Sequence, residues 1–233
     1  MDAPADAPVD REVTRLEGFS DAVFGFTITL LVASLEVPAT FDDLVAAFRG
    51  LPAFAVTFSI LLLVWHEHHR FFRRFAAQDG LTIWLNGALL FVVMIYIYPL
   101  KFLFTILIGP GFSKAIAGGL SMIRVDQIVT LMVMYGVGFA AIFGLLGAMY
   151  LHAGRRAGAG PEDRTDALLG AGHCGVYVLV GMLSIAVAVF GDGPRASMLA
   201  GVTYSALGPL QALYHRLTAR RVRPRGSPGT ASP

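Results

Sequence analysis

Charge is scarce in this chain, since only 15% of its 233 residues are charged whereas 55% are hydrophobic. In a typical soluble domain, about a quarter of the residues are charged. The composition therefore excludes an ordinary soluble domain and places the chain in a membrane. Cysteine is nearly absent too: Cys174 stands alone, which excludes an intramolecular disulfide.

Motifs of enzyme chemistry are also missing. Neither Walker nor Rossmann glycine spacing occurs, and no Ser, His and Asp set suggests a nucleophilic triad. We therefore expect no enzyme activity and no cofactor. The sequence also contains no Thr-Val-Gly-Tyr-Gly loop of the kind that forms carbonyl ion filters. The net charge of +2 indicates no particular partner, and we expect no nucleic acid.

Six long apolar stretches are present instead. The first lies within residues 15–38 and carries no charge from Ala22 to Leu35; the others lie at about 45–65, 81–109, 127–151, 167–190 and 196–215. Each is near or above the roughly 20 residues that a membrane-spanning helix needs. The sequence predicts an all-α polytopic membrane protein with six transmembrane helices.

The tails differ from this region. Residues 1–14 have no signal-peptide pattern and are expected to form a short cytoplasmic tail. Residues 15–217 would form the membrane domain. Residues 218–233 are rich in Arg, Pro, Gly and Ser, so we expect a disordered basic tail attracted to anionic lipid.

The distribution of Lys and Arg predicts the orientation. With a cytoplasmic N-terminus, 13 of the 18 fall on the inner side: Arg11, Arg15, Arg70, Arg73, Arg74, Arg155, Arg156, Arg164, Arg216, Arg220, Arg221, Arg223 and Arg225. The outer side keeps Arg49, Lys114, Arg124 and Arg195, and Lys101 lies inside the third stretch, from which it can reach the outer interface. Both termini are therefore expected in the cytoplasm of a cell-membrane protein.

The second stretch ends in Trp65-His66-Glu67-His68-His69. A helical zinc motif places two histidines four residues apart, but the residue four after His66 is Arg70, so we expect no structural metal. Trp65 and His69 are four apart and share one helix face. In the third stretch, Asn86 is an amide in an apolar helix and needs a hydrogen-bond partner.

A small-residue stripe occurs in the fourth stretch, where Gly136, Ala140, Gly144 and Ala148 recur every four residues. Such a stripe lets another helix approach closely, so we interpret it as a packing device.

The first two turns of the first stretch are unusually polar. They contain Arg15, Phe19, Ser20 and Asp21, and ionisable groups inside a span are functional candidates. The pattern Arg-x-x-x-Phe-Ser-Asp, followed by a helix rich in Ile, Thr and Leu, resembles the signature of the transmembrane protein 175 family of potassium channels. The resemblance implies a polar network that joins Arg15 and Asp21 to Trp65 and His69, with His68 as the other candidate histidine. It also implies that the partner of Asn86 is the signature.

The first helix also carries a stripe about 100° wide, formed by Ala22, Phe26, Thr29, Leu30, Ala33 and Val37. From the residues alone, helix packing explains this stripe, with the Thr29 hydroxyl bonded back to its own helix. In the family the first helix lines the pore, and single-unit members assemble as four subunits.

The resemblance places the constriction, a Thr layer and a further apolar residue at Phe26, Thr29 and Ala33. Phe26 is bulkier and Ala33 smaller than the family's usual residues, so the tightest point is expected at Phe26 or at Leu30. We therefore expect a homotetrameric potassium channel in contact with membrane lipids, with permeant potassium near Thr29. The alternatives are a proton-coupled secondary transporter and a non-conducting membrane scaffold.

Overall fold

Helices and their connections make up the part of the chain that the structure describes, and no strand occurs within it. The structure, a computed structural model, describes residues 14–34, 37–108, 125–191 and 199–222. Its elements are α1 (Arg15–Ala33), α2 (Phe41–Arg74), α3 (Gly80–Ile108), α5 (Val125–Arg155), α6 (Pro161–Phe190), the 3-10 helix η1 (Thr203–Ala206) and α8 (Leu207–Val222). The predicted all-α fold class is confirmed.

Local capping explains where helices begin. The side chain of Thr14 accepts a hydrogen bond from the N–H of Glu17 (3.1 Å) and starts α1. Thr40 and Asp43 form a capping box before α2, and α6 begins with Pro161, whose missing N–H would have no helical partner at that position. Because these residues precede the apolar stretches, α2 and α6 begin four and six residues before the expected 45–65 and 167–190.

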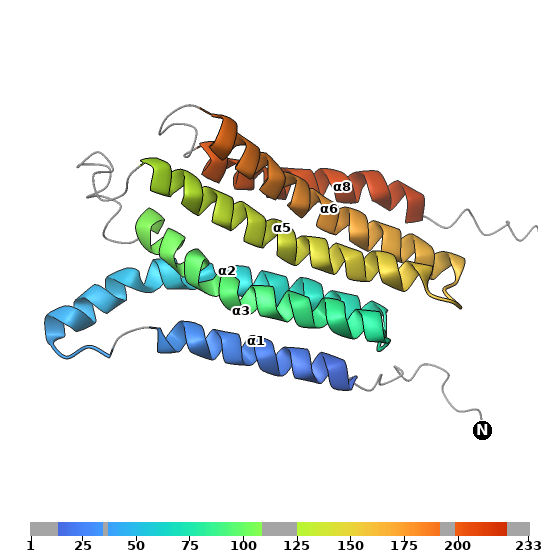
Figure 1. Ribbon diagram of the computed structural model, residues 1–233, viewed down its shortest axis with the longest axis horizontal. Helices are drawn as coiled ribbons and strands as arrows, with labels where there is room; N and C mark the ends of the chain where they lie inside the picture. The colour runs from blue at the N-terminus through green and yellow to red at the C-terminus, as the bar shows by residue number, and fades with distance from the viewer. Residues whose placement is uncertain (1–13, 35–36, 109–124, 192–198, 223–233) are drawn as a thin grey trace, which may run out of the picture.

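The helices form layers that lie side by side (Figure 1). α1 packs against α2 and α3, α3 packs against α5, α5 packs against α6, and α8 covers α6. α1 therefore lies at one edge of the bundle, and the other described helices cover only one of its sides.

Among the described residues, five helices are long and apolar enough to cross a membrane: α1, α2, α3, α5 and α6. The described part of the sixth expected span, 196–215, is not one regular α-helix, because residues 199–202 are helical but lead into η1 before α8 starts. The hydroxyls of Thr203 and Ser205 donate to carbonyls three residues earlier (2.6 and 2.7 Å), and Pro209 has no N–H to continue a regular helix. The count of six spans is thus only partly supported.

The ends of the chain were expected to be tails. α8 continues to Val222, past the expected start of the basic tail at residue 218. Residues 1–13 and 223–233 lie outside the described residues, as do Lys114, Arg124 and Arg195.

α2 is bent, and Figure 1 shows its first part turned away from the rest of the bundle. Pro52 lies inside this helix. Proline removes one backbone hydrogen bond and its ring clashes with the preceding turn, which is a common cause of such bends. This bend was not expected from the sequence.

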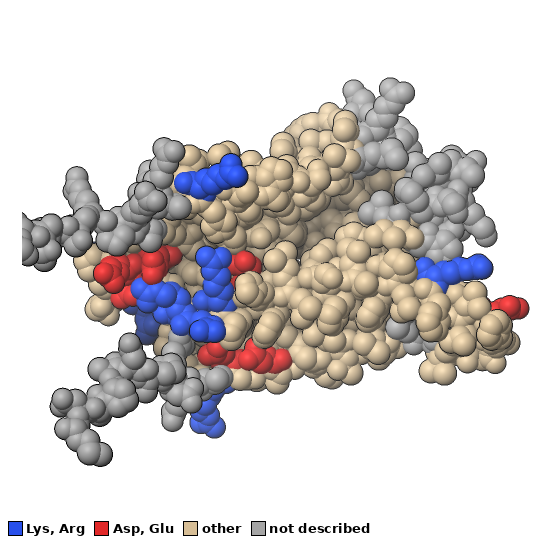
Figure 2. Space-filling view, turned by 180° about the vertical axis from the view of Figure 1, so that it is seen from behind, with Lys and Arg blue, Asp and Glu red and all other residues tan. Residues whose placement is uncertain are grey.

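Charged side chains gather at one end of the molecule, as Figure 2 shows. We call it the polar end: it comprises the start of α1, the connections 75–79 and 156–160, and the end of α8. There Asp79 contacts Nε2 of His152 (2.6 Å), accepts from the Thr82 hydroxyl (2.8 Å) and lies 3.4 Å from Nε of Arg156. Burial raises the pKa of Asp79, but His152, Thr82 and Arg156 outweigh it and lower the pKa to about 2. An ionised Asp79 thus ties the α2–α3 connection to α5.

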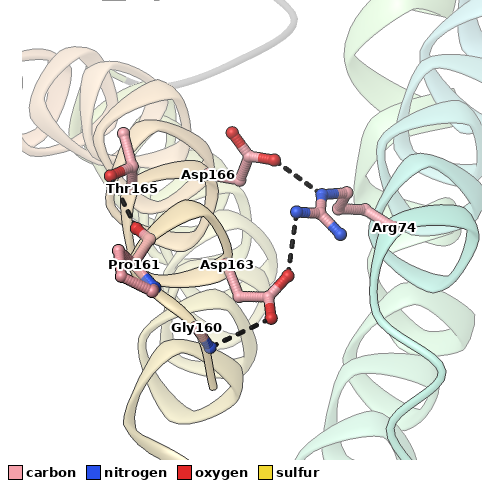
Figure 3. Close-up of polar contacts among 6 residues, drawn as sticks. All are labelled: Arg74, Gly160, Pro161, Asp163, Thr165 and Asp166. Carbon is pink, nitrogen blue, oxygen red and sulfur yellow. Dashed lines mark hydrogen bonds and ion pairs between the residues drawn. The ribbon is translucent and has the colours of Figure 1, made fainter.

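A second polar contact joins α2 to α6 at the same end (Figure 3). Nη2 of Arg74 lies 2.8 Å from Oδ1 of Asp163, and its Nε donates to Oδ2 of Asp166 at 2.6 Å. Asp163 also accepts from the backbone N–H of Gly160 at the helix start (3.2 Å). These contacts link the first half of the bundle, α1 to α3, with the second half, α5 to α8.

Candidate functional site: the outer face of α1 and its polar anchors

A buried chain of hydrogen bonds fixes the start of α1 to α3 and α2. The Ser20 hydroxyl donates to the carbonyl of Leu16 (2.8 Å) and accepts from Nδ2 of Asn86 (2.9 Å). Oδ1 of Asn86 lies 2.8 Å from Nε2 of His68. Ser20, Asn86 and His68 are at most 1% exposed, so each would be unpaired without these contacts.

A second contact joins Asp21 to α2. The indole Nε1 of Trp65 donates to Oδ1 of Asp21 at 2.8 Å. The ring of His69 stacks on Trp65, with centroids 5.3 Å apart, and its Nδ1 lies 3.6 Å from Oε1 of the buried Glu17. His69 thus adjoins the signature through Glu17 and Trp65, whereas His68 makes the contact with Asn86.

Two signature residues lie apart from these contacts. Arg15 is exposed, and among the described residues no hydrogen bond or ion pair joins it to Asp21, Trp65 or Asn86. Phe19 is 60% exposed. The structure therefore brings together four of the five residues expected in the polar network, with Ser20, Glu17 and His68 added, and leaves Arg15 outside.

The predicted stripe of α1 lies on the side that the other described helices leave uncovered. Phe26 is 55% exposed, Thr29 and Ala33 are exposed, and Leu30 is half-buried. On the opposite side, Phe24, Thr27 and Leu31 are almost completely buried against the bundle. Contacts among the described residues therefore leave the apolar side chains of the stripe uncovered, for lipid or another subunit to cover.

The hydroxyl of Thr29 donates to the carbonyl of Gly25, four residues earlier, at 3.0 Å. This is the bond that the packing interpretation of the sequence expects. It occupies the hydroxyl proton only, so the oxygen keeps acceptor capacity on the exposed side of the helix.

The other end of α1 is fixed by Lys101. Its Nζ donates to the backbone carbonyl (2.8 Å) and to the hydroxyl oxygen (2.6 Å) of Ser34, the C-cap of α1. A cation at a helix C-terminus also interacts favourably with the helix dipole. Lys101 was expected to reach the outer interface but not to bind Ser34, because no local pattern in the sequence relates residues 34 and 101.

The histidine cluster after Trp65 does not converge on one point. His66 is exposed, His68 faces Asn86, and Glu67 faces His173 of α6. Within the described ranges, no group of three His, Cys, Asp or Glu side chains is arranged to hold a metal ion.

The fold and the buried contacts define a polytopic helical membrane protein whose first helix is anchored at both ends. Comparison with known proteins then specifies its class. The sequence profile described as endosomal/lysosomal potassium channel TMEM175 matches residues 15–97. A potassium channel from Marivirga tractuosa is 32% identical over 231 residues, covering 91% of this chain and 90% of that protein. The chain belongs to the TMEM175 family of potassium channels, and this family consists of ion channels rather than enzymes.

Other relatives agree with this assignment. A potassium channel from Chamaesiphon minutus is 34% identical over 113 residues, which is 45% of this chain and 56% of that protein. The crystal structure of a variant of the potassium channel MtTMEM175, bound to a nanobody fusion, has a TM-score of 0.76 at 31% identity and covers 94% of this chain and 98% of that chain. A TMEM175 homologue from Chamaesiphon minutus has a TM-score of 0.57 at 22% identity over 88% of this chain and 96% of that chain, which supports the fold.

Proposed function

We propose that four copies of this chain form a potassium channel in which α1 lines the pore. The observation that carries the proposal is the exposed stripe of α1, with Phe26, Thr29 and Ala33 on the side that the other described helices leave uncovered. Family membership supports potassium as the permeant ion. The channel is a multi-pass protein of the cell membrane, with both termini in the cytoplasm.

The chemistry of the stripe suggests how ions cross. Phe26 and Leu30 form stacked apolar rings around the axis, and such constrictions hinder ions because water leaves them readily. Thr29 lies between them in sequence and offers hydroxyl oxygens that replace part of the ion's water shell. The tightest point is Phe26 or Leu30, and Ala33 leaves a wider passage beyond them.

The anchors of α1 fit this role. A pore-lining helix must keep one orientation about its own axis. A rotation by one residue position, about 100°, would turn the whole stripe away from the pore. Ser20 and Asp21 hold one end of α1 against α3 and α2, and Ser34 holds the other end through Lys101. The signature residues Ser20 and Asp21 therefore position the pore helix, while potassium passes near Thr29.

Reconstituted channels carrying Phe26→Asn test the proposal. A polar side chain at the constriction should keep it wet and raise single-channel conductance, about tenfold for each 1.4 kcal/mol removed from the barrier. Thr29→Val should instead weaken the preference for potassium over sodium. Both are measured from single-channel currents and reversal potentials.

A matched control is Phe102→Asn, because Phe102 of α3 is 55% exposed, the same fraction as Phe26. It should leave conductance unchanged. Assembled Phe26→Asn and Thr29→Val channels with unaltered conductance and ion preference would refute the pore role of α1. A current that saturates and moves protons in fixed proportion would instead favour the transporter alternative.

A further inference from the structure

We propose that Glu67 of α2 and His173 of α6 act as a positioning pair that sets where Trp65 meets Asp21 on α1. Nε2 of His173 lies 3.2 Å from Oε1 of Glu67, and the two side chains are only 7% and 6% exposed. The contact has ion-pair distance without an aligned hydrogen bond. Ionisable side chains buried inside a membrane protein are rare and functional by default, yet neither Glu67 nor His173 belongs to the signature or to the stripe of α1.

The pair lies on the side of α2 opposite to the contacts with α1. Trp65 and Glu67 are two residues apart, which is about 200° around a helix. Trp65 and His68 accordingly reach Asp21 of α1 and Asn86 of α3, while Glu67 reaches α6. Any shift of this part of α2 toward or away from α6 therefore changes the position of Trp65 relative to Asp21.

Glu67 is poorly compensated apart from His173. Nη1 of Arg70 lies 3.6 Å from its Oε2, and this oxygen has no hydrogen-bond partner among the described residues. A buried carboxylate that loses its partner is strongly destabilising, whereas removal of both partners of a buried pair is often tolerated. The pair therefore holds α2 at one distance from α6.

The contact of Arg74 with Asp163 and Asp166, which also joins α2 to α6, constrains the distance between the two helices less. The side chains of Arg74, Asp163 and Asp166 are 40–43% exposed, so water competes for them. His173, by contrast, is also held from α8: Nε2 of Gln211 donates to its backbone carbonyl (3.1 Å), and the His215 ring lies 5.2 Å from its own. The pair thus connects the second half of the bundle to the anchor of α1.

Fluorescence of Trp65 reports on this connection directly. The chain has two tryptophans, and Trp84 is 78% exposed, so Trp84→Phe leaves Trp65 as the only one. In that background, Asp21→Ala gives the emission of Trp65 without its hydrogen bond. We expect His173→Gln to move the emission maximum toward this reference, because the Glu67 carboxylate is left without its imidazole. Addition of Glu67→Gln removes that charge and should return the emission toward the starting value.

The control is Glu162→Gln, an exposed acid at the start of α6, which should leave the emission unchanged. An unchanged emission in His173→Gln would overturn the proposal. The proposal would also be overturned if the emission maximum of the double variant shifted at least as far as that of His173→Gln alone. A purely steric role of His173 predicts that result. If His173→Gln does not fold, recovery of folded protein on adding Glu67→Gln supports the pair, and no recovery overturns it.

Only the effect on conductance rests on the proposed pore. We expect His173→Gln to change single-channel conductance and the double variant to restore it. Emission that shifts and recovers while conductance stays constant would support the positioning pair and count against α1 as the pore lining. A failure of the positioning pair can therefore be distinguished from a failure of the proposed pore.

Discussion

At the scale of single residues, the signature divides into anchors and exposed side chains. Ser20 and Asp21 are engaged by Asn86 and Trp65, whereas Phe19 is exposed on the same helix. A hydrogen bond to a charged group contributes about 1.5–3 kcal/mol, so the loss of one anchor is a measurable fraction of total stability.

Asp21 provides a residue-scale prediction that separates hydrogen bonding from charge. Asp21→Ala removes the acceptor of the Trp65 indole and should lower the unfolding free energy by about 1.5–3 kcal/mol. Asp21→Asn keeps an oxygen acceptor and should recover about half of that loss. Thermal unfolding in detergent measures both variants. Equal losses for Ala and Asn would mean that the negative charge, rather than the bond, is what α1 requires.

The sequence was enough to identify these polar residues but not all of their contact partners. The i, i+4 spacing of Trp65 and His69 indicated a shared face, and the apolar surroundings of Asn86 indicated a need for a partner. The choice of His68 for Asn86 and of Glu67 for His173 depends on how α2 is rotated between its neighbours. Local periodicity does not determine that rotation, because polar side chains occur all around this part of the helix.

At the scale of elements, the small-residue stripe of α5 explains the close approach of α6. A Cβ atom at Gly136 would lie 2.3 Å from Cγ1 of Ile185 and 3.0 Å from the carbonyl of Gly181. Ala140 and Gly144 also adjoin α6, at Gly181 and Val178. The predicted packing device is thus an interface between two consecutive helices of one chain.

Gly136→Ala should therefore separate α5 from α6 and lower the unfolding free energy by about 1–3 kcal/mol. Gly175→Ala on α6 is the matched control, since a Cβ there meets nothing within 4 Å. It should be neutral or stabilising by up to about 1 kcal/mol through helix propensity. If both variants melt at the same temperature as the unaltered protein, the stripe does not determine the packing of α5 on α6.

Apolar length was enough to predict five of the helices, but not their interruptions. α3 matches its expected range within one residue at each end, because an uninterrupted apolar run leaves a membrane helix few alternatives. The bend near Pro52 and the 3-10 turn at Thr203–Ala206 arise from single residues that remove or redirect backbone hydrogen bonds. Their consequences depend on neighbouring helices, which the sequence alone does not place.

At the scale of the whole molecule, the chain combines an edge helix with a larger supporting bundle. α1 begins and α8 ends at the polar end (Figure 1), where Arg74 joins the two halves of the bundle (Figure 3). Asp79 also joins them there, through His152. The orientation of that end toward the cytoplasm stays a prediction from the 13 of 18 basic residues. We propose that four exposed faces of α1, one from each subunit, enclose the ion pathway.

The most direct test is thiol modification of a channel with one cysteine at Thr29. The natural cysteine, Cys174, is fully buried, so Cys174→Ala provides the background for Thr29→Cys. A membrane-impermeant thiol reagent should abolish most of the potassium current of this variant, because the modified side chain fills the pathway. Phe102→Cys, equally exposed as Phe26 but on α3, should conduct as before. Complete labelling of Thr29→Cys with an unchanged single-channel current would contradict the account.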